Sequence, residues 1–183
     1  RRFEIKVRGG LGPGEKDGHS IRILNRIIEW GTDGITYEAD QRHAEIIAAE
    51  FAKDNSRNVD TPGVRTGSGT PDGHKHIGRR EKAFRAVAAR ANYLAQDRPD
   101  IQFASKEVSR GMANPDIDDW AAAERLSKYL RSHPRVVMKF PFQAKPTCVD
   151  VIVDTDYAGC RKTRKSTNGG ALKHGEHTVK TWS

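Results

Sequence analysis

A Gly- and Pro-rich stretch, Asn55–Arg80, interrupts the hydrophobic pattern of this 183-residue chain. It contains five glycines and two prolines but few large apolar residues. Such a composition buries too little apolar surface to fold and is typical of a linker. The chain is therefore expected to fold as separate segments on either side of this stretch, with residues 63–80 as a flexible linker.

The part before the linker predicts strands followed by a helix. Arg2–Arg8 alternates apolar and charged residues, the period of a half-buried strand, and Ile21–Trp30 predicts a second strand. Thr32-Asp33-Gly34 predicts a hairpin turn, and Ile35–Glu38 predicts the returning strand. Asp40 can cap the helix that follows, whose apolar residues recur at helical spacing: Ala44, Ile47, Ala48 and Phe51.

Three helices are predicted after the linker. The first runs from about Glu81 to Ala95, and the second begins near Pro99, because proline is favoured in a first helical turn. Asn114-Pro115 predicts the start of the third helix, with Asn114 as its cap, and His133-Pro134 predicts its end. Apolar stripes on these helices predict a shared core.

The last part of the chain returns to strands. Val136–Phe142, Cys148–Asp154 and His177–Trp182 have strand composition, and Asn168-Gly169-Gly170 predicts a turn before a short strand at Ala171–Lys173. We therefore expect an α+β fold in four parts. These are an N-terminal β-hairpin plus helix (residues 1–62), the linker (63–80), a central segment of three helices (81–134) and a C-terminal β-sheet (135–183).

Positive charge is concentrated near the C-terminal end. The formal net charge is +8, of which residues 157–183 carry +5. Four of the cations lie close together: Arg161, Lys162, Arg164 and Lys165. A dense basic patch favours an anionic partner, above all nucleic acid. A solvated loop that only keeps the protein soluble is the alternative.

Other features narrow the class of protein. No apolar run approaches the roughly 18–20 residues of a membrane span, so we expect none. Two cysteines, Cys148 and Cys160, cannot build a disulfide scaffold, which favours a reducing, intracellular compartment. The chain does not begin with Met, and we expect it to be part of a longer protein.

One motif has the residue types of a metal site. The apolar strand Val151-Ile152-Val153 is followed by Asp154 and Asp156. If the strand continues, both carboxylates lie on one face, and carboxylates at a strand end can hold Mg²⁺. Two such ions can stabilise the attacking and leaving oxygens of a phosphodiester. The alternative is that both aspartates only end a strand and cap the basic turn that follows.

Several short segments together point to a family. Ordered along the chain they are 35–43 (ITYEADQRH), 61–64 (TPGV), 90–101 (RANYLAQDRPDI), 120–130 with its tryptophan and YL pair, 154–159 (DTDYAG), 164–169 (RKSTNG) and 181–183 (TWS). In this order and spacing, the chain resembles the Pol polyprotein of copia-type retrotransposons. The resemblance runs from the end of the reverse transcriptase, through the connection, to the opening of the ribonuclease H domain.

The resemblance implies a role for each candidate residue. The C-terminal strands would form an incomplete ribonuclease H-like β-sheet, with Asp154 as its first catalytic, metal-binding carboxylate. Asp156 follows as a second candidate ligand of Mg²⁺. The four clustered cations would lie where the backbone of RNA, DNA or an RNA–DNA hybrid passes.

The chain also departs from the family. It contains neither the Y-x-D-D aspartate pair of the polymerase nor the later S-x-x-E-A-E carboxylates of ribonuclease H, and Tyr157 replaces the family's tryptophan. The resemblance therefore implies a polyprotein fragment that binds nucleic acid but is catalytically incomplete alone. Mg²⁺ is expected only if another chain completes the site.

Two alternatives follow from these departures. In the first, the chain is a captured retroelement remnant that serves as a structural subunit of a larger protein or nucleoprotein assembly. A partner would then cover the unpaired strand edge that half a ribonuclease H sheet leaves. In the second, another protein chain supplies the missing carboxylates and the assembly is an active enzyme.

Overall fold

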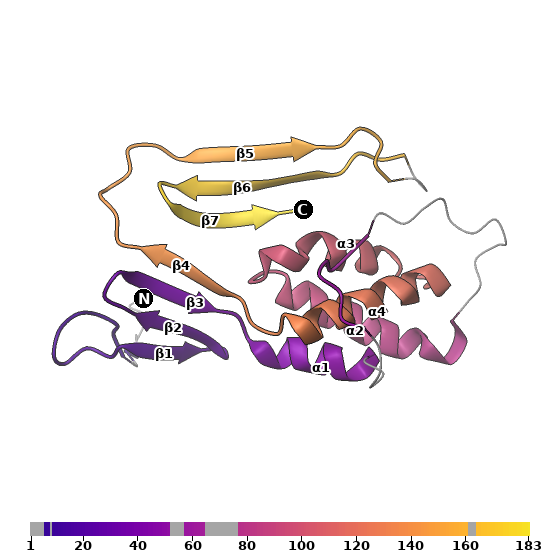
Figure 1. Cartoon of the computed structure of the whole chain (residues 1–183), viewed down its shortest axis with the longest axis horizontal. Helices are drawn as coiled ribbons and strands as arrows, with labels where there is room; N and C mark the ends of the chain where they lie inside the picture. The colour runs from indigo at the N-terminus through magenta and orange to yellow at the C-terminus, as the bar shows by residue number, and fades with distance from the viewer. Residues whose placement is uncertain (1–5, 8, 52–56, 65–76, 161–163) are drawn as a thin grey trace, which may run out of the picture.

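The computed structural model describes residues 6–7, 9–51, 57–64, 77–160 and 164–183. Within this part the protein has two antiparallel sheets and four α-helices, which confirms the α+β fold class (Figure 1). The predicted strand Arg2–Arg8 falls almost entirely outside the described residues, as do residues 65–76 of the predicted linker.

The first sheet has the strand order β1-β2-β3-β4, formed by Ser20–Ile23, Arg26–Trp30, Gly34–Glu38 and Val137–Pro141. The prediction of one strand over Ile21–Trp30 was wrong. Leu24 and Asn25, with φ angles of 50° and 63°, form a two-residue turn between Ile23 and Arg26. Positive φ at both residues gives the turn the twist that a hairpin needs.

The predicted hairpin into β3 and the helix cap after it are confirmed. The Gly31 N–H donates to the Gly34 carbonyl at 2.8 Å, which closes the turn before β3. Asp40 Oδ1 accepts the Arg42 N–H at 3.0 Å, and helix α1 begins at Gln41. Because the aspartate satisfies a donor that the first helical turn leaves free, it fixes the start of this helix.

Strand β4 pairs with β3 although the helices separate the two in sequence. The register runs from Glu38 opposite Val137 to Gly34 opposite Pro141. Arg135, just before β4, donates from Nε and Nη2 to the Glu38 carboxylate at 2.7 and 2.8 Å. The division of the chain at residue 135 stays a prediction, but this pairing ties residues 137–141 to the N-terminal sheet.

The helices are α1 Gln41–Phe51, α2 Glu81–Leu94, α3 Gln102–Arg110 and α4 Ile117–Ser132, with short 3₁₀ turns η1 Gly78–Arg80 and η2 Pro99–Ile101. The helices pack around one apolar core, which confirms the predicted apolar stripes. The fully buried residues of this core are Ala44, Ile47, Phe84, Ala88, Ala91, Ile101, Ala123, Leu126 and Leu130. Among the described residues, no helix is long and apolar enough to cross a bilayer.

Helix α4 begins two residues later than its sequence predicts. Asp116, and not Asn114, is the cap: its Oδ1 accepts the Asp119 N–H at 2.9 Å, and Asp119 Oδ2 accepts the Asp116 N–H at 3.0 Å. This reciprocal pair satisfies two donors at once, which a single Asn cap cannot do. The predicted end at His133-Pro134 is confirmed.

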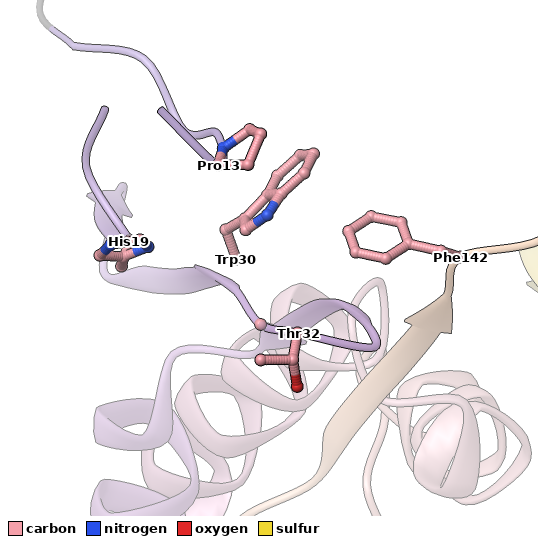
Figure 2. A pocket seen from close by; sticks show the side chains of 6 residues that line it. Pro13, His19, Trp30, Thr32 and Phe142 are labelled. Carbon is pink, nitrogen blue, oxygen red and sulfur yellow. The ribbon is translucent and has the colours of Figure 1, made fainter. Parts of the chain in front are cut away.

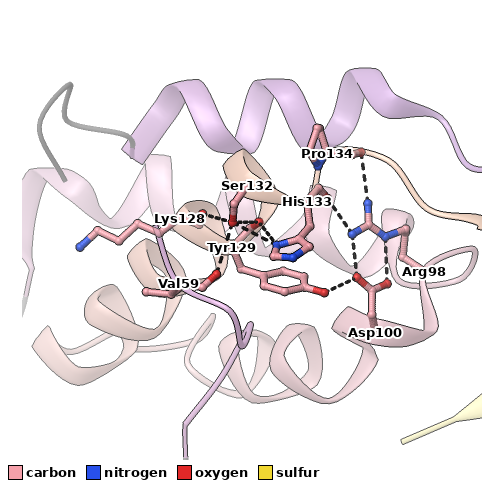
Figure 3. A network of polar contacts seen from close by, with 8 residues as sticks. All are labelled: Val59, Arg98, Asp100, Lys128, Tyr129, Ser132, His133 and Pro134. Carbon is pink, nitrogen blue, oxygen red and sulfur yellow. Dashed lines mark hydrogen bonds and ion pairs between the residues drawn. The ribbon is translucent and has the colours of Figure 1, made fainter. Parts of the chain in front are cut away.

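A buried arginine joins the end of α4 to the start of η2 (Figure 3). Arg98 is 1% exposed, and its guanidinium donates to both Asp100 oxygens, at 2.9 and 2.7 Å. It also donates to the carbonyls of His133 and Pro134, at 2.9 and 3.2 Å, while the Tyr129 hydroxyl donates to Asp100 at 3.0 Å. Burial alone would raise the pKa of Asp100, but its bonds with Arg98 outweigh burial and lower that pKa.

A second polar network joins the first sheet to the helices. Arg26 Nε and the Tyr37 hydroxyl both donate to the Asp97 carboxylate, at 2.7 and 2.6 Å. Burial and the hydrogen bond to Asp97 raise the pKa of Tyr37 to about 12. The sheet is therefore held against the turn that follows α2.

The second sheet is formed by β5 Asp150–Thr155, β6 Asn168–His174 and β7 His177–Trp182, in that order. The predicted turn at Asn168–Gly170 was wrong, because these residues belong to β6. Gly170 lies against Trp182, and a Cβ there would come within 2.7 Å of the indole Cη2. The absence of a side chain at Gly170 therefore lets the Trp182 ring pack directly against β6.

Strand β7 of the second sheet contacts both helix α3 and the end of β4. Gln102 Nε2 of α3 donates to the Thr181 carbonyl at 3.4 Å, and His177 Nε2 donates to the Pro141 carbonyl at 2.7 Å. Strand β5 lies on the far side of the sheet, away from the helices (Figure 1).

Candidate carboxylate site and basic loop

The first candidate residue, Asp154, lies near the end of β5 and is exposed. Its partner in the β5–β6 register is Gly169. Because glycine has no side chain, nothing opposite Asp154 on β6 covers its carboxylate. The structure therefore leaves this carboxylate open to solvent at a strand end, where the sequence predicted it.

The second candidate, Asp156, has different surroundings. Its Oδ1 accepts the Thr167 N–H at 2.5 Å, and its own N–H donates to the Thr167 carbonyl at 3.0 Å. The carboxylate also lies against Gly159, where a Cβ would collide with it. Asp156 thus fastens the base of the loop between β5 and β6.

Two of the four predicted cations lie in the described part of that loop. Arg164 and Lys165 are exposed, whereas Arg161 and Lys162 lie outside the described residues. The Cys160 N–H donates to the Lys165 carbonyl at 3.1 Å, and the Arg164 N–H donates to the Cys160 carbonyl at 2.7 Å. These bonds close the loop, so that it presents both cations beyond the end of β5.

Helix α3 brings a further cation to the same region. Lys106 Nζ donates to Ser183 Oγ at 3.3 Å and lies 5.0 Å from the centroid of the Phe103 ring. Burial lowers the pKa of Lys106, as does Arg110, while Glu107 and Asp156 oppose that shift. The hydrogen bonds of Gln102 with Thr181 and of Lys106 with Ser183 place α3 against the C-terminal end of β7.

Sequence reasoning missed Lys106 because it lies in a different segment from the loop. The periodicity of α3 could have shown that Phe103, Lys106 and Arg110 share one helix face. No local pattern, however, indicates that this face meets the C-terminal sheet.

An aromatic pair lies elsewhere, at the end of the first sheet (Figure 2). The Trp30 and Phe142 rings are tilted by 47° with centroids 5.0 Å apart. They line a shallow pocket with Pro13, His19 and Thr32. The side chains that line this pocket include no Lys or Arg.

Within the part of the chain that the structure describes, Asp154 and Asp156 are not joined by a third candidate metal ligand. Carboxylate oxygens suit Mg²⁺, but the ion takes about six ligands in octahedral geometry. Asp156 already accepts a backbone N–H, and the described part of the chain holds no group of three or more His, Cys, Asp or Glu residues that could bind a metal.

Comparison with known proteins finds relatives among transposon proteins. The chain is 31% identical to a retrovirus-related Pol polyprotein from transposon RE2 of Arabidopsis thaliana, over 55% of this chain and 7% of that protein. It is 30% identical to the corresponding polyprotein from transposon RE1 of the same plant, with the same coverage. It is also 32% identical to the uncharacterized mitochondrial protein AtMg00810 of Arabidopsis thaliana, over 47% of this chain and 35% of that protein.

No protein-family model and no solved structure matches the chain. The chain spans only a small part of the length of the polyproteins that it matches. Over about half of its own length the chain is similar to the Pol polyproteins of transposons, and the resemblance predicted from its motifs is thereby confirmed.

Proposed function

We propose that this chain is part of a retrotransposon reverse transcriptase–ribonuclease H polyprotein and that it binds nucleic acid through the loop between β5 and β6. One observation carries the proposal: the loop holds Arg164 and Lys165 exposed beyond the strand that bears Asp154. The similarity to transposon Pol polyproteins supports the kind of partner.

The loop is suited to contact a phosphate backbone. Hydrogen bonds of Asp156 with Thr167, and of Cys160 with Arg164 and Lys165, hold the described residues of the loop in place. Arg164 can donate to a phosphate through its planar fork, and Lys165 can act as a point charge. Such contacts position a nucleic acid without reading its sequence. RNA, DNA and RNA–DNA hybrids are therefore all candidate partners.

The proposal does not include catalysis by this chain alone. Asp154 would supply one carboxylate to a metal site, and the other ligands would come from another chain. Mg²⁺ bound there would stabilise charge on the oxygens of a phosphodiester. The residues of this chain would hold the backbone beside the metal and contribute one ligand to it.

Salt-dependent binding to a labelled RNA–DNA hybrid tests the proposal. The Arg164→Gln/Lys165→Gln variant should bind more weakly, and the slope of log affinity against log salt should fall by about 0.9 for each phosphate that the variant no longer neutralises. A variant with Lys82→Gln and Lys145→Gln is the matched control, because both lysines are exposed outside the loop. Equal weakening by the two variants would show that net charge, and not the loop, accounts for binding.

A second candidate function is that of a structural subunit in a larger protein or nucleoprotein assembly. The observation that favours it is the outer strand β5, whose apolar side chains are exposed. Binding to proteins without nucleic acid, unaffected by the Arg164→Gln/Lys165→Gln variant, would support this candidate over the first.

A further inference from the structure

Residues 57–64 form a strap across helices α3 and α4. Ser132 Oγ of α4 donates to the Val59 carbonyl at 3.3 Å (Figure 3). Gly63 lies against α3, where a Cβ added to this glycine would lie 3.4 Å from Ala104 Cβ. Both contacts join residues of this chain to one another. The strap is therefore held on the helices near each of its ends.

Between these two points the strap presents a hydroxyl to an arginine. Arg125 Nη2 of α4 donates to Thr61 Oγ1 at 2.7 Å. The neighbouring Arg125 Nε is buried and has no hydrogen-bond partner among the described residues. Because buried polar atoms are nearly always hydrogen-bonded, a buried donor of this kind calls for an acceptor. The guanidinium therefore uses only one half of the fork that Nε and Nη2 form.

Two other arginines of this chain show what the complete fork binds. Arg98 donates from Nε and Nη2 to the two carboxylate oxygens of Asp100. Arg135 makes the same pair of bonds to Glu38. A phosphate group offers paired oxygens with more charge, and arginine binds phosphate through the same fork. A phosphate carried by Thr61 would place its oxygens before Nε and Nη2 of Arg125, because both nitrogens lie on one edge of the guanidinium.

The sequence at Thr61 fits a modification that supplies such a group. Thr61 is exposed and is followed by Pro62, and proline-directed protein kinases phosphorylate a Ser or Thr that precedes proline. In that reaction Thr61 Oγ1 attacks the γ-phosphorus of ATP. The Oγ1–P bond forms, the bond between the γ-phosphorus and the β–γ bridging oxygen breaks, the hydroxyl proton passes to a base of the kinase, and ADP leaves. The added group carries about −1.5 to −2 charges and three acceptor oxygens.

We propose that Thr61 is a phosphorylation site and that Arg125 binds the phosphate through Nε and Nη2. Two charge-assisted hydrogen bonds then take the place of the single bond to the neutral hydroxyl. The modification thereby fastens the strap to α4. This site lies in the helical segment, and its use does not depend on nucleic-acid binding by the loop between β5 and β6.

The neighbouring charges make Arg125 the cation on which phosphate binding depends. Lys128, three residues after Arg125 on α4, pairs with Glu124 at 2.9 Å. Asp60, which precedes Thr61, is exposed and repels an anion. Lys128 is therefore a matched control: it is a cation of the same helix whose charge is already balanced.

Phosphorus-31 NMR of the full chain tests the binding of the phosphate. Phosphothreonine is incorporated in place of Thr61 during synthesis, and the second ionisation of its phosphate is titrated. This ionisation has a pKa of about 6 in a free side chain, and the arginine fork should lower that pKa by about one unit, a tenfold preference for the dianion. Arg125→Gln and Arg125→Lys should both bring the pKa back toward 6, the second because lysine lacks the planar fork. Lys128→Gln should leave the lowered pKa unchanged.

Treatment of the folded chain with a proline-directed kinase and ATP tests the modification itself. The sequence has one other Ser or Thr that precedes proline, Thr70, which lies outside the described residues. The Thr70→Ala variant should take up one phosphate, and peptide mass spectrometry should place it on Thr61. Thr61→Ala/Thr70→Ala should take up none. A short peptide that spans Thr61 is the positive control for the kinase.

Either of two results would overturn the proposal. The first is a phosphate pKa that stays near 6 in the otherwise unchanged chain, or a lowered pKa that both Arg125 variants retain. The second is an unmodified Thr61 in the folded chain under conditions in which the kinase modifies the control peptide completely. Binding of the RNA–DNA hybrid is measured on separate variants, so either result leaves the nucleic-acid proposal intact.

Discussion

Replacing Arg98 by methionine should destabilise the protein more than any single surface change. The guanidinium is 1% exposed and has four hydrogen bonds, two to the Asp100 carboxylate and two to the last carbonyls of the α4 region. Methionine fills a similar volume but leaves Asp100 and both carbonyls without these donors. Removing one partner of a buried ion pair costs about 3–5 kcal/mol.

Equilibrium unfolding in urea measures this loss. With a slope of about 2 kcal/mol per molar urea, a loss of about 3 kcal/mol moves the midpoint down by about 1.5 M. Tyr129→Phe removes only one hydroxyl from Asp100, so it should cost about 1 kcal/mol. Arg98→Lys keeps the charge but not the planar fork, and its midpoint should fall between those of the two other variants.

The pH dependence separates this explanation from a simple packing defect. Because the pKa of Asp100 is lowered in the folded protein, its stabilising contribution is present above the unfolded value near 3.8 and is lost as pH falls through the folded value. In Arg98→Met the burial of Asp100 instead raises that pKa. The stability difference between wild type and variant should therefore begin to narrow above about pH 4, where folded Arg98→Met takes up a proton on Asp100, and should narrow further below it, where the wild type loses its ion pair. A constant difference across pH 3–7, or a loss below about 1 kcal/mol, would refute the reasoning.

Three further predictions concern other parts of the protein. The pKa of Tyr37 is raised to about 12, so this tyrosine ionises at lower pH in the unfolded chain than in the folded protein. The free energy of unfolding should therefore fall as pH rises from about 10 to 12. Ultraviolet titration of Tyr37→Phe against wild type identifies Tyr37 as the tyrosine responsible. Burial lowers the pKa of His43, so the unfolded chain takes up a proton on this histidine before the folded protein does. The free energy of unfolding should therefore fall as pH drops below about 6.5. Urea unfolding at several pH values should show a weaker pH dependence for His43→Gln. Gly170→Ala should cost about 1–3 kcal/mol in the second sheet because the new methyl meets the Trp182 ring, seen as lost amide protection in β6 and β7 with α2 and α4 unchanged.

The helical core was predictable from sequence because one periodicity covers it. Residues at helical spacing, such as Phe84, Val87, Ala91 and Leu94, are buried where the pattern places them. The errors lie where local signals compete. Leu24 and Asn25 form a turn without a glycine, and Asp116 displaces Asn114 as a cap because Asp119 is placed to reciprocate.

The candidate site was predictable only in part, for a related reason. The exposed strand end at Asp154 follows from local composition, and so do the loop cations Arg164 and Lys165. The anchoring hydrogen bond between Asp156 and Thr167 and the approach of Lys106 depend on tertiary packing. The composition of residues 137–141 predicts a strand, but it cannot show which strand they pair with. Their partner β3 lies about 100 positions earlier in the chain.

The pairing of β3 with β4 has a consequence for the order in which the protein folds. Glu38 and Val137 face each other although they are about 100 positions apart. During synthesis the first sheet must therefore wait, with β3 unpaired on one side, until the whole helical segment and β4 have left the ribosome. Contacts of such long sequence separation slow folding, while the helices can form from local contacts alone. The helical segment is thus expected to fold first and to bring β4 to β3, so that a chain shortened before residue 137 would keep a helical core beside an unfinished sheet.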